Sequence, residues 1–140
     1  MNKNKLNLDS FKHQPLLKLN KPIKLANGSI LPEAIISYKT YGKLNKKKTN
    51  AILICHALTG DQYASGKHPL TNKKGWWNEM IGPNLVLDTK KFFIICSNVL
   101  GGCMGTTGPR SLNPLTKRPY GINFPEITIK DIVFLQKGID

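Results

Sequence analysis

With 140 residues, of which 40% are hydrophobic, the chain is long enough for one core but not for two independent domains. It has no run of about 18 apolar residues, and no apolar segment follows its basic start, so we expect neither a membrane span nor a signal peptide, and a cytoplasmic location. The formal net charge of +13 raises the question of nucleic-acid binding, but only Arg110 and Arg118 are arginines and no aromatic residues interleave with the lysines, which favours a solvated lysine-rich surface.

The N-terminal third of the sequence predicts an arm followed by an antiparallel hairpin. Residues 1–15 are polar and lysine-rich and are expected to form a flexible basic arm, with a short strand near Leu16–Leu19. The pair Asn27-Gly28 is a strong signal for a two-residue turn, and apolar residues flank it on both sides. The second arm of this hairpin is expected to continue as far as Tyr41.

Two continuous apolar runs of strand length lie in the middle of the chain, at Ala51–Cys55 and Phe92–Cys96. Strands that are apolar on both faces belong inside a sheet that helices cover. The long connection between the runs, in which Trp76–Ile81 could form a short helix or turn, favours parallel pairing. Residues 16–140 therefore predict part of a single α/β domain, in which an antiparallel hairpin leads into a mainly parallel sheet.

The last third predicts a long loop and then a helix. Residues 99–127 are rich in Gly and Pro, and a structureless stretch of this length in a compact domain is usually a functional loop. Thr128 is placed to cap the helix, and Asp131 follows it as in a capping box. One face of the helix is expected to carry Ile129, Ile132, Val133, Gln136 and Ile139. No cap or strand follows the helix, which favours a truncated domain.

The sequence contains no complete catalytic or metal-binding motif. It lacks Gly-x-Ser-x-Gly, so no nucleophile elbow is expected. The three cysteines have no disulfide or zinc spacing and are interpreted as structural thiols, and the three histidines have no metal-ligand spacing. Cys103 and His56 could form a catalytic pair, but nothing marks the thiol as activated. His13 and His68 are expected on the surface.

Two segments are candidates for a ligand site. Residues 56–61 follow directly on the first apolar run, and a turn at the carboxyl end of a buried strand is where open α/β sheets bind ligands. Its N–H groups could point at a developing oxyanion, although position alone favours a plain turn in which His56 packs or hydrogen-bonds. Residues 101–109 match neither a P-loop nor a dinucleotide motif. A ligand loop and a structural loop are equally open for them.

Several segments resemble the homoserine O-acetyltransferases in order and spacing. They are His56–Tyr63, Gly75–Trp77, Asp88–Thr89, Asn98–Pro109, Pro119–Gly121 and Phe124–Asp131. Residues 25–42 also look like the N-terminal hairpin of that family, so the resemblance covers nearly the whole chain from about Leu16 onward. It implies an α/β-hydrolase fold, usually in a homodimer, with no bound cofactor and no membrane or nucleic-acid partner.

The activity that the resemblance implies is transfer of acetyl from acetyl-CoA to L-homoserine, a step toward methionine. The mechanism would be ping-pong, with a Ser-His-Asp triad. By motif position, Leu58 would give one backbone N–H to the oxyanion hole, and Thr59 and Asp61 would lie near the acyl and homoserine pocket. The triad would lie beyond Asp140, so we expect a fragment cut before the nucleophile elbow and lid, and inactive by itself.

Other interpretations stay open at this stage. The same fold could serve a homoserine O-succinyltransferase or a serine O-acyltransferase, because the residues that choose the acyl group and its acceptor lie partly outside the sequence. A non-catalytic remnant would keep the fold and act only in binding or dimerisation. A basic nucleic-acid binder would bind DNA with an affinity that falls steeply as salt rises, and it is the least favoured of these.

Overall fold

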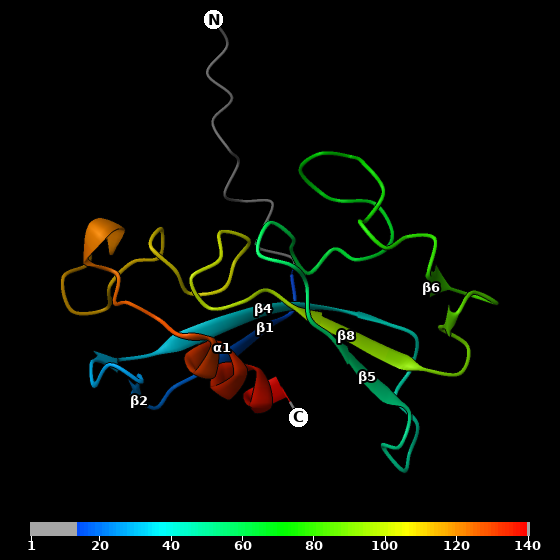
Figure 1. Ribbon diagram of the computed structural model, residues 1–140, viewed down its shortest axis with the longest axis horizontal. Coiled ribbons are helices and arrows are strands. Elements are labelled where there is room, and N and C mark those ends of the chain that lie inside the picture. The colour runs from blue at the N-terminus through cyan, green and yellow to red at the C-terminus, as the bar shows by residue number, and fades with distance from the viewer. Residues whose placement is uncertain (1–13, 140) are drawn as a thin grey trace, which may run out of the picture.

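The computed structural model describes residues 14–139, and Figure 1 shows a sheet running through its centre. Its strands are β1 (Leu16–Leu19), β4 (Ala34–Tyr41), β5 (Ala51–Ile54) and β8 (Phe93–Ser97), in the order β1-β4-β8-β5. The short strand expected at Leu16–Leu19 is therefore confirmed. Most of the arm predicted for residues 1–15 lies outside the described residues, and the assignment of residues 16–140 to one domain stays a prediction.

The two apolar runs pair with each other in parallel. β5 pairs with β8 from Ala51 opposite Phe93 to Ile54 opposite Cys96. The long crossover between them is what such a parallel pair requires, so the parallel pairing is confirmed. The expectation that both runs lie inside a covered sheet is wrong for β5, which is an edge strand of the described sheet and has Leu53 47% exposed. β4 pairs antiparallel with both β8 and β1. The sheet is therefore mixed and not mainly parallel as expected, because β4 pairs antiparallel on both of its sides. The partial α/β character that the sequence predicts is confirmed.

The N-terminal hairpin forms, but its second arm is shorter than expected. β2 (Ile23–Lys24) and β3 (Ile30–Leu31) pair antiparallel around the predicted Asn27-Gly28 turn. Gly28 has a φ of 86°, a left-handed conformation that glycine adopts without strain. The second arm ends after β3 because Pro32 has no N–H with which to continue the ladder. The chain then enters β4, which pairs with β1 instead.

The crossover between β5 and β8 consists of turns and two very short strands. β6 (Ile81–Gly82) and β7 (Leu87–Asp88) pair in parallel. The segment Trp76–Ile81, predicted as a short helix or turn, forms turns that lead into β6. In one of them the N–H of Met80 donates to the carbonyl of Trp77 at 2.9 Å. The crossover therefore brings no α-helix to the part of the sheet that the structure describes.

The helix α1 (Ile129–Gln136) begins at the predicted capping box. The Thr128 side chain accepts from the N–H of Asp131, and the Asp131 carboxylate accepts from the N–H of Thr128 at 2.7 Å. Two 3-10 turns accompany it, η2 (Gly121–Asn123) before and η3 (Lys137–Ile139) after. Across residues 14–139, no helix combines the length and the apolarity that crossing a bilayer requires.

The helix buries only part of the face expected. Gln136 is buried and Ile132 is partly buried, as expected, but Ile129 and Val133 are 75% and 46% exposed. Asp131 and Leu135, which were not expected on that face, are buried. The cause is a contact across 105 positions of the sequence, in which the N–H of Ala26 donates to the Asp131 carboxylate at 2.8 Å. This bond turns the Asp131 side of the helix toward the hairpin and leaves the Ile129 side open.

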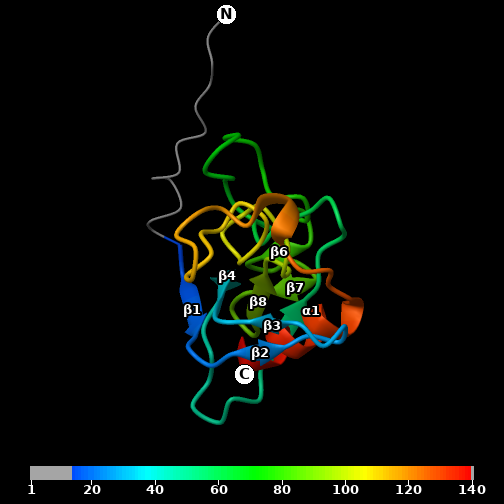
Figure 2. The same cartoon turned by 90° about the vertical axis from the view of Figure 1, so that its left-hand side faces the viewer.

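Two apolar clusters hold the chain together. The first joins the hairpin, β4 and α1, which lie next to one another in Figure 2. Its buried members are Ile23, Leu25, Leu31, Ala34, Ile36, Leu100, Tyr120 and Leu135. The second lies between β5, β8 and the crossover, and its buried members are Ile54, Ala64, Ile81, Ile94 and Cys96. The first cluster therefore supports the loop after β8, and the second supports the turn after β5.

Candidate active site

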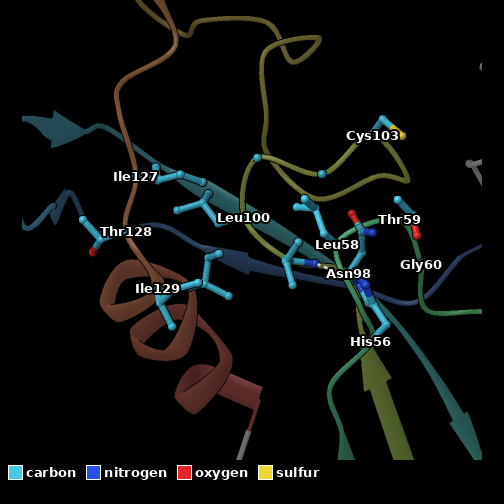
Figure 3. A pocket seen from close by; sticks show the side chains of 14 residues that line it. His56, Leu58, Thr59, Gly60, Asn98, Leu100, Cys103, Ile127, Thr128 and Ile129 are labelled. Atoms are coloured by element: carbon cyan, nitrogen blue, oxygen red, sulfur yellow. Dashed lines mark hydrogen bonds between the residues drawn. The ribbon is translucent and has the colours of Figure 1, made fainter.

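A pocket of about 640 Å³ opens where β5 and β8 end, and Figure 3 shows it from close by. Its walls come from within residues 56–60, 98–103 and 127–132. The carboxyl ends of parallel strands are where open α/β sheets bind ligands. The structure therefore brings together the two segments that the sequence marks as candidate ligand sites, and it adds the start of α1.

His56 ties the two loops of the pocket together. Its ring is 9% exposed, and its Nε2 accepts from the N–H of Val99 at 3.3 Å. Nδ1 lies 2.7 Å from the carbonyl of Ala57, so Nδ1 carries the proton and donates it. Because both ring nitrogens are engaged, His56 is a hydrogen-bonding residue of the turn, and no catalytic pair with Cys103 forms.

Leu58 lies at the rim of the pocket with its side chain 95% exposed. The turn is closed by another residue, since the N–H of Gly60 donates to the carbonyl of Ala57 at 2.8 Å. Within residues 14–139, the N–H of Leu58 has no acceptor. The turn thus does not use this amide, and the role of Leu58 as an oxyanion-hole donor stays a prediction.

Of the two predicted substrate-binding residues, Thr59 lines the pocket and Asp61 does not. The Asp61 carboxylate accepts from the N–H of Tyr63 at 2.8 Å and pairs with Nε2 of His68 at 2.9 Å. The Asp61 carbonyl accepts from the indole N–H of Trp76 at 2.9 Å. Asp61 therefore holds the crossover, and the His68 side chain, expected on the surface, is only 13% exposed because this pair buries it.

The glycine-rich loop is attached to β4 by its two threonines. The hydroxyl oxygen of Thr107 accepts from the N–H of Ile35 at 2.8 Å, and that of Thr106 accepts from the N–H of Ser37 at 3.0 Å. The Thr106 hydroxyl in turn donates to the carbonyl of Asn98 at 2.7 Å. These threonines are therefore structural, while the first residues of the loop line the pocket.

Asn98 is a pocket residue that the sequence analysis did not single out. Its side chain is 2% exposed, and its Oδ1 has no hydrogen-bond partner within the described residues. Its backbone N–H donates to the carbonyl of Ser37 at 2.8 Å, which fixes the residue directly after β8. The sequence signal that could have identified Asn98 is its place as a polar residue directly after a buried strand. The family resemblance included Asn98 only as part of the longer segment Asn98–Pro109.

The cysteines near the site differ in burial. Burial raises the pKa of the Cys96 thiol to about 12, and the nearby Asp61 carboxylate adds to this effect, so the thiol is neutral at pH 7. Cys55 and Cys103 are exposed free thiols. In the part of the chain that the structure describes, no group of three or more His, Cys, Asp or Glu side chains could hold a metal ion.

Known proteins resemble this chain over most of its length, although no protein-family model matches it. It is 59% identical to the homoserine O-acetyltransferase of Methanohalophilus mahii over 118 residues. These aligned residues make up 84% of this chain and 24% of that protein. It is 55% identical over 117 residues to the homoserine O-acetyltransferase of Caulobacter vibrioides, which covers 84% of this chain and 31% of that protein. The chain thus spans about a quarter to a third of the length of these curated relatives.

Solved structures superpose on most of this chain. The homoserine O-acetyltransferase from Bacillus anthracis superposes with a TM-score of 0.81 and 33% identity, over 90% of this chain and 35% of that chain. Esterase E22 superposes with a TM-score of 0.79 and 33% identity, over 90% of this chain and 36% of that chain. Both likenesses confirm the partial α/β-hydrolase fold that the resemblance implies.

Proposed function

This chain is related in sequence to part of the homoserine O-acetyltransferases, and we propose that it forms one wall of an acyltransfer site. This wall is the pocket lining from residues 56–60, 98–103 and 127–132, and it includes the oxyanion-hole donor Leu58. The reaction is transfer of acetyl from acetyl-CoA to the hydroxyl of L-homoserine. The observation that supports this proposal most directly is the free N–H of Leu58 at the rim of a pocket where β5 and β8 end. An unused amide at this position is available as a donor to a carbonyl oxygen that gains negative charge.

Each part of the wall has a separate task in this proposal. The N–H of Leu58 donates to the thioester oxygen as the tetrahedral intermediate forms. His56 holds the turn in place through Val99 and Ala57, so the donor does not have to be ordered during the reaction. Leu100 and Ile132, with the other apolar lining residues, keep water away from the acyl group.

The remaining features of the proposal follow from the resemblance. A serine attacks the thioester, a histidine that a carboxylate orients takes its proton, and the acyl-enzyme then acylates homoserine. The 140 residues contain no Gly-x-Ser-x-Gly, so these three groups are not assigned to this chain. A homodimer in the cytoplasm, with acetyl-CoA as substrate and no bound cofactor, completes the proposal.

A chimera tests the proposal. The 140 residues replace the matching segment of the Caulobacter vibrioides relative, to which they are 55% identical. Release of free thiol from acetyl-CoA is then followed with and without L-homoserine. We expect homoserine-dependent release at a rate near that of the unaltered relative. A folded chimera that releases no thiol would show that this chain cannot supply the wall.

Ester hydrolysis is a second candidate, and the likeness to esterase E22 favours it. Water would then replace homoserine as the acceptor of the acyl group, and the same Leu58 amide would stabilise the oxyanion. Succinyl-CoA and L-serine, tested in the same assay, cover the other acyltransfers. Thiol release that does not depend on homoserine, together with hydrolysis of p-nitrophenyl acetate, would favour the esterase.

A further inference from the structure

The strongest unexplained feature of the pocket is the side-chain amide of Asn98. The residue is 2% exposed, yet within residues 14–139 its Oδ1 has no hydrogen-bond partner. Buried polar side chains almost always have such partners, so an unpaired one calls for an explanation. Asn98 lines the pocket together with Leu58 and Thr59, and Figure 3 labels all three.

The two ends of this amide face different surroundings. A Cβ atom on Gly102 would lie 2.5 Å from Oδ1, so the oxygen lies against the loop backbone and needs the space that glycine leaves. Oδ1 is fully buried, whereas Nδ2 is not among the buried unpartnered atoms of the described residues. The amide nitrogen is therefore the end that can donate into the pocket.

The chemistry of the walls narrows the choice of ligand. No Asp, Glu, Lys or Arg lines the pocket within the described residues, and its surface is mainly apolar, with Leu100, Ile127 and Ile132 among its members. The ammonium and carboxylate groups of a free amino acid would find no opposite charge there, and burying them unpaired is costly. A neutral acyl chain with a carbonyl oxygen fits these walls and would accept from Nδ2.

We propose that Asn98 binds the acyl donor in this pocket by donating a hydrogen bond from Nδ2 to a neutral carbonyl oxygen. The inference rests on the proposed acyltransfer and names a second donor beside Leu58. Acetyl-CoA offers two kinds of such oxygen: the acyl carbonyl, which stays on the enzyme after the thiol leaves, and the amide carbonyls of the thiol arm, which leave with it.

Steady-state kinetics of the chimera separate these oxygens. In a ping-pong reaction, kcat/KM for acetyl-CoA reports on acylation and kcat/KM for homoserine reports on deacylation. We expect Asn98→Ala to lower kcat/KM for acetyl-CoA about 100-fold, the size seen on removing one oxyanion-hole donor. An equal loss in kcat/KM for homoserine identifies the acyl carbonyl. An unchanged value for homoserine identifies an amide of the thiol arm.

Two further variants guard against a loss that comes from misfolding. Asn98→Asp keeps the shape of the side chain and removes the Nδ2 donor. Gly102→Ala keeps the Asn98 amide but displaces it, because the new Cβ would lie 2.5 Å from Oδ1. Both variants should therefore change the two kcat/KM values as Asn98→Ala does. Asn123→Ala makes the same truncation at an exposed residue of η2 and should leave both constants unchanged. If Asn98→Ala and Asn98→Asp do not fold, Gly102→Ala decides by itself.

The outcomes distinguish this inference from the proposed function. A loss confined to kcat/KM for homoserine would overturn it, because Asn98 would then contact the acceptor. Changes below about twofold in both constants for a folded variant would also overturn it and leave the acyltransfer proposal intact. An unmutated chimera that folds but shows no homoserine-dependent turnover would instead remove the proposed function.

Discussion

The two sides of this molecule differ in how fully their polar and apolar groups are used. On the hairpin side, Asp131 satisfies the start of α1 and the Ala26 amide, and Leu135 is 1% exposed in a shared core, in which the Tyr120 hydroxyl is the one buried side-chain polar atom without a partner among the described residues. On the pocket side, the Leu58 amide and the Asn98 side chain lack partners among the described residues, and Ile129 is 75% exposed. The first side is built for stability, and the second leaves its groups available for binding.

This difference predicts that mutations on the two sides separate activity from stability. A change in the pocket should alter turnover while the chain stays folded. A change at the hairpin and helix should alter unfolding while the site chemistry is untouched. A mutation that moves both quantities together would show that the two sides are one unit.

The largest expected effect concerns the chain by itself. The proposed serine nucleophile and its base are not assigned to these 140 residues, so the proposal leaves the pocket side with donors but no group that attacks the thioester. We expect the 140-residue chain to release thiol from acetyl-CoA and homoserine about a million-fold more slowly than the chimera, the loss typical of removing a serine nucleophile. A thiol assay on the purified chain checks this. Turnover above the uncatalysed background would contradict it.

The next largest effect is expected from deleting a single N–H. In the chimera, Leu58→Pro removes the amide donor, whereas Leu58→Ala keeps it and trims a side chain that is 95% exposed. We expect kcat to fall about 100- to 1000-fold for Leu58→Pro and far less for Leu58→Ala. Because this turn adds little to either core, the melting temperature should stay close to that of the parent. Equal kcat values for the two variants would exclude the Leu58 amide as the donor.

At Leu135 we expect a mutation to lower stability without changing the chemistry of the site. Leu135→Ala creates a cavity in the first core and should lower the free energy of unfolding by about 2–5 kcal/mol. The neighbouring Phe134 is 62% exposed on the same helix. Phe134→Ala should therefore change the free energy of unfolding by less than about 0.5 kcal/mol. Urea denaturation followed by far-UV circular dichroism measures both. Similar losses for the two variants would mean that the helix does not pack as described.

Local signals in the sequence predict much of the fold, and partners distant in sequence decide the rest. The Asn27-Gly28 turn and the capping box depend on residues within a few positions, and both are confirmed. The buried face of α1 also depends on Ala26, 105 positions away, so apolar periodicity placed Ile132 and Gln136 correctly but not Ile129 and Val133.

The candidate site shows the same division. Leu58 and Thr59 could be placed at the carboxyl end of a strand by chain order, and the structure puts both at the pocket. The pairing of Asp61 with His68 and the unpaired amide of Asn98 arise from how loops meet, which no local pattern records. The sequence therefore locates the site better than it assigns the roles of its residues.

The smallest effect is expected from titrating Asp131. Burial alone would raise the pKa of this carboxyl, but the N–H and hydroxyl of Thr128 and the N–H of Ala26 donate to it and hold its pKa below the usual value. A lowered pKa in the fold means that the ionised form contributes stability above the unfolded pKa of about 3.9, and that this contribution is lost as pH falls through the folded pKa.

Asp131→Asn should therefore lower the melting temperature of the chain at pH 7 by less than Leu135→Ala does. The gap between the parent and Asp131→Asn should stay constant down to about pH 4 and close below it, because the parent then loses its charge as well. Melting curves of both proteins between pH 7 and pH 3 measure this gap. A gap that does not depend on pH would show that the shape of the side chain, and not its charge, links α1 to the hairpin.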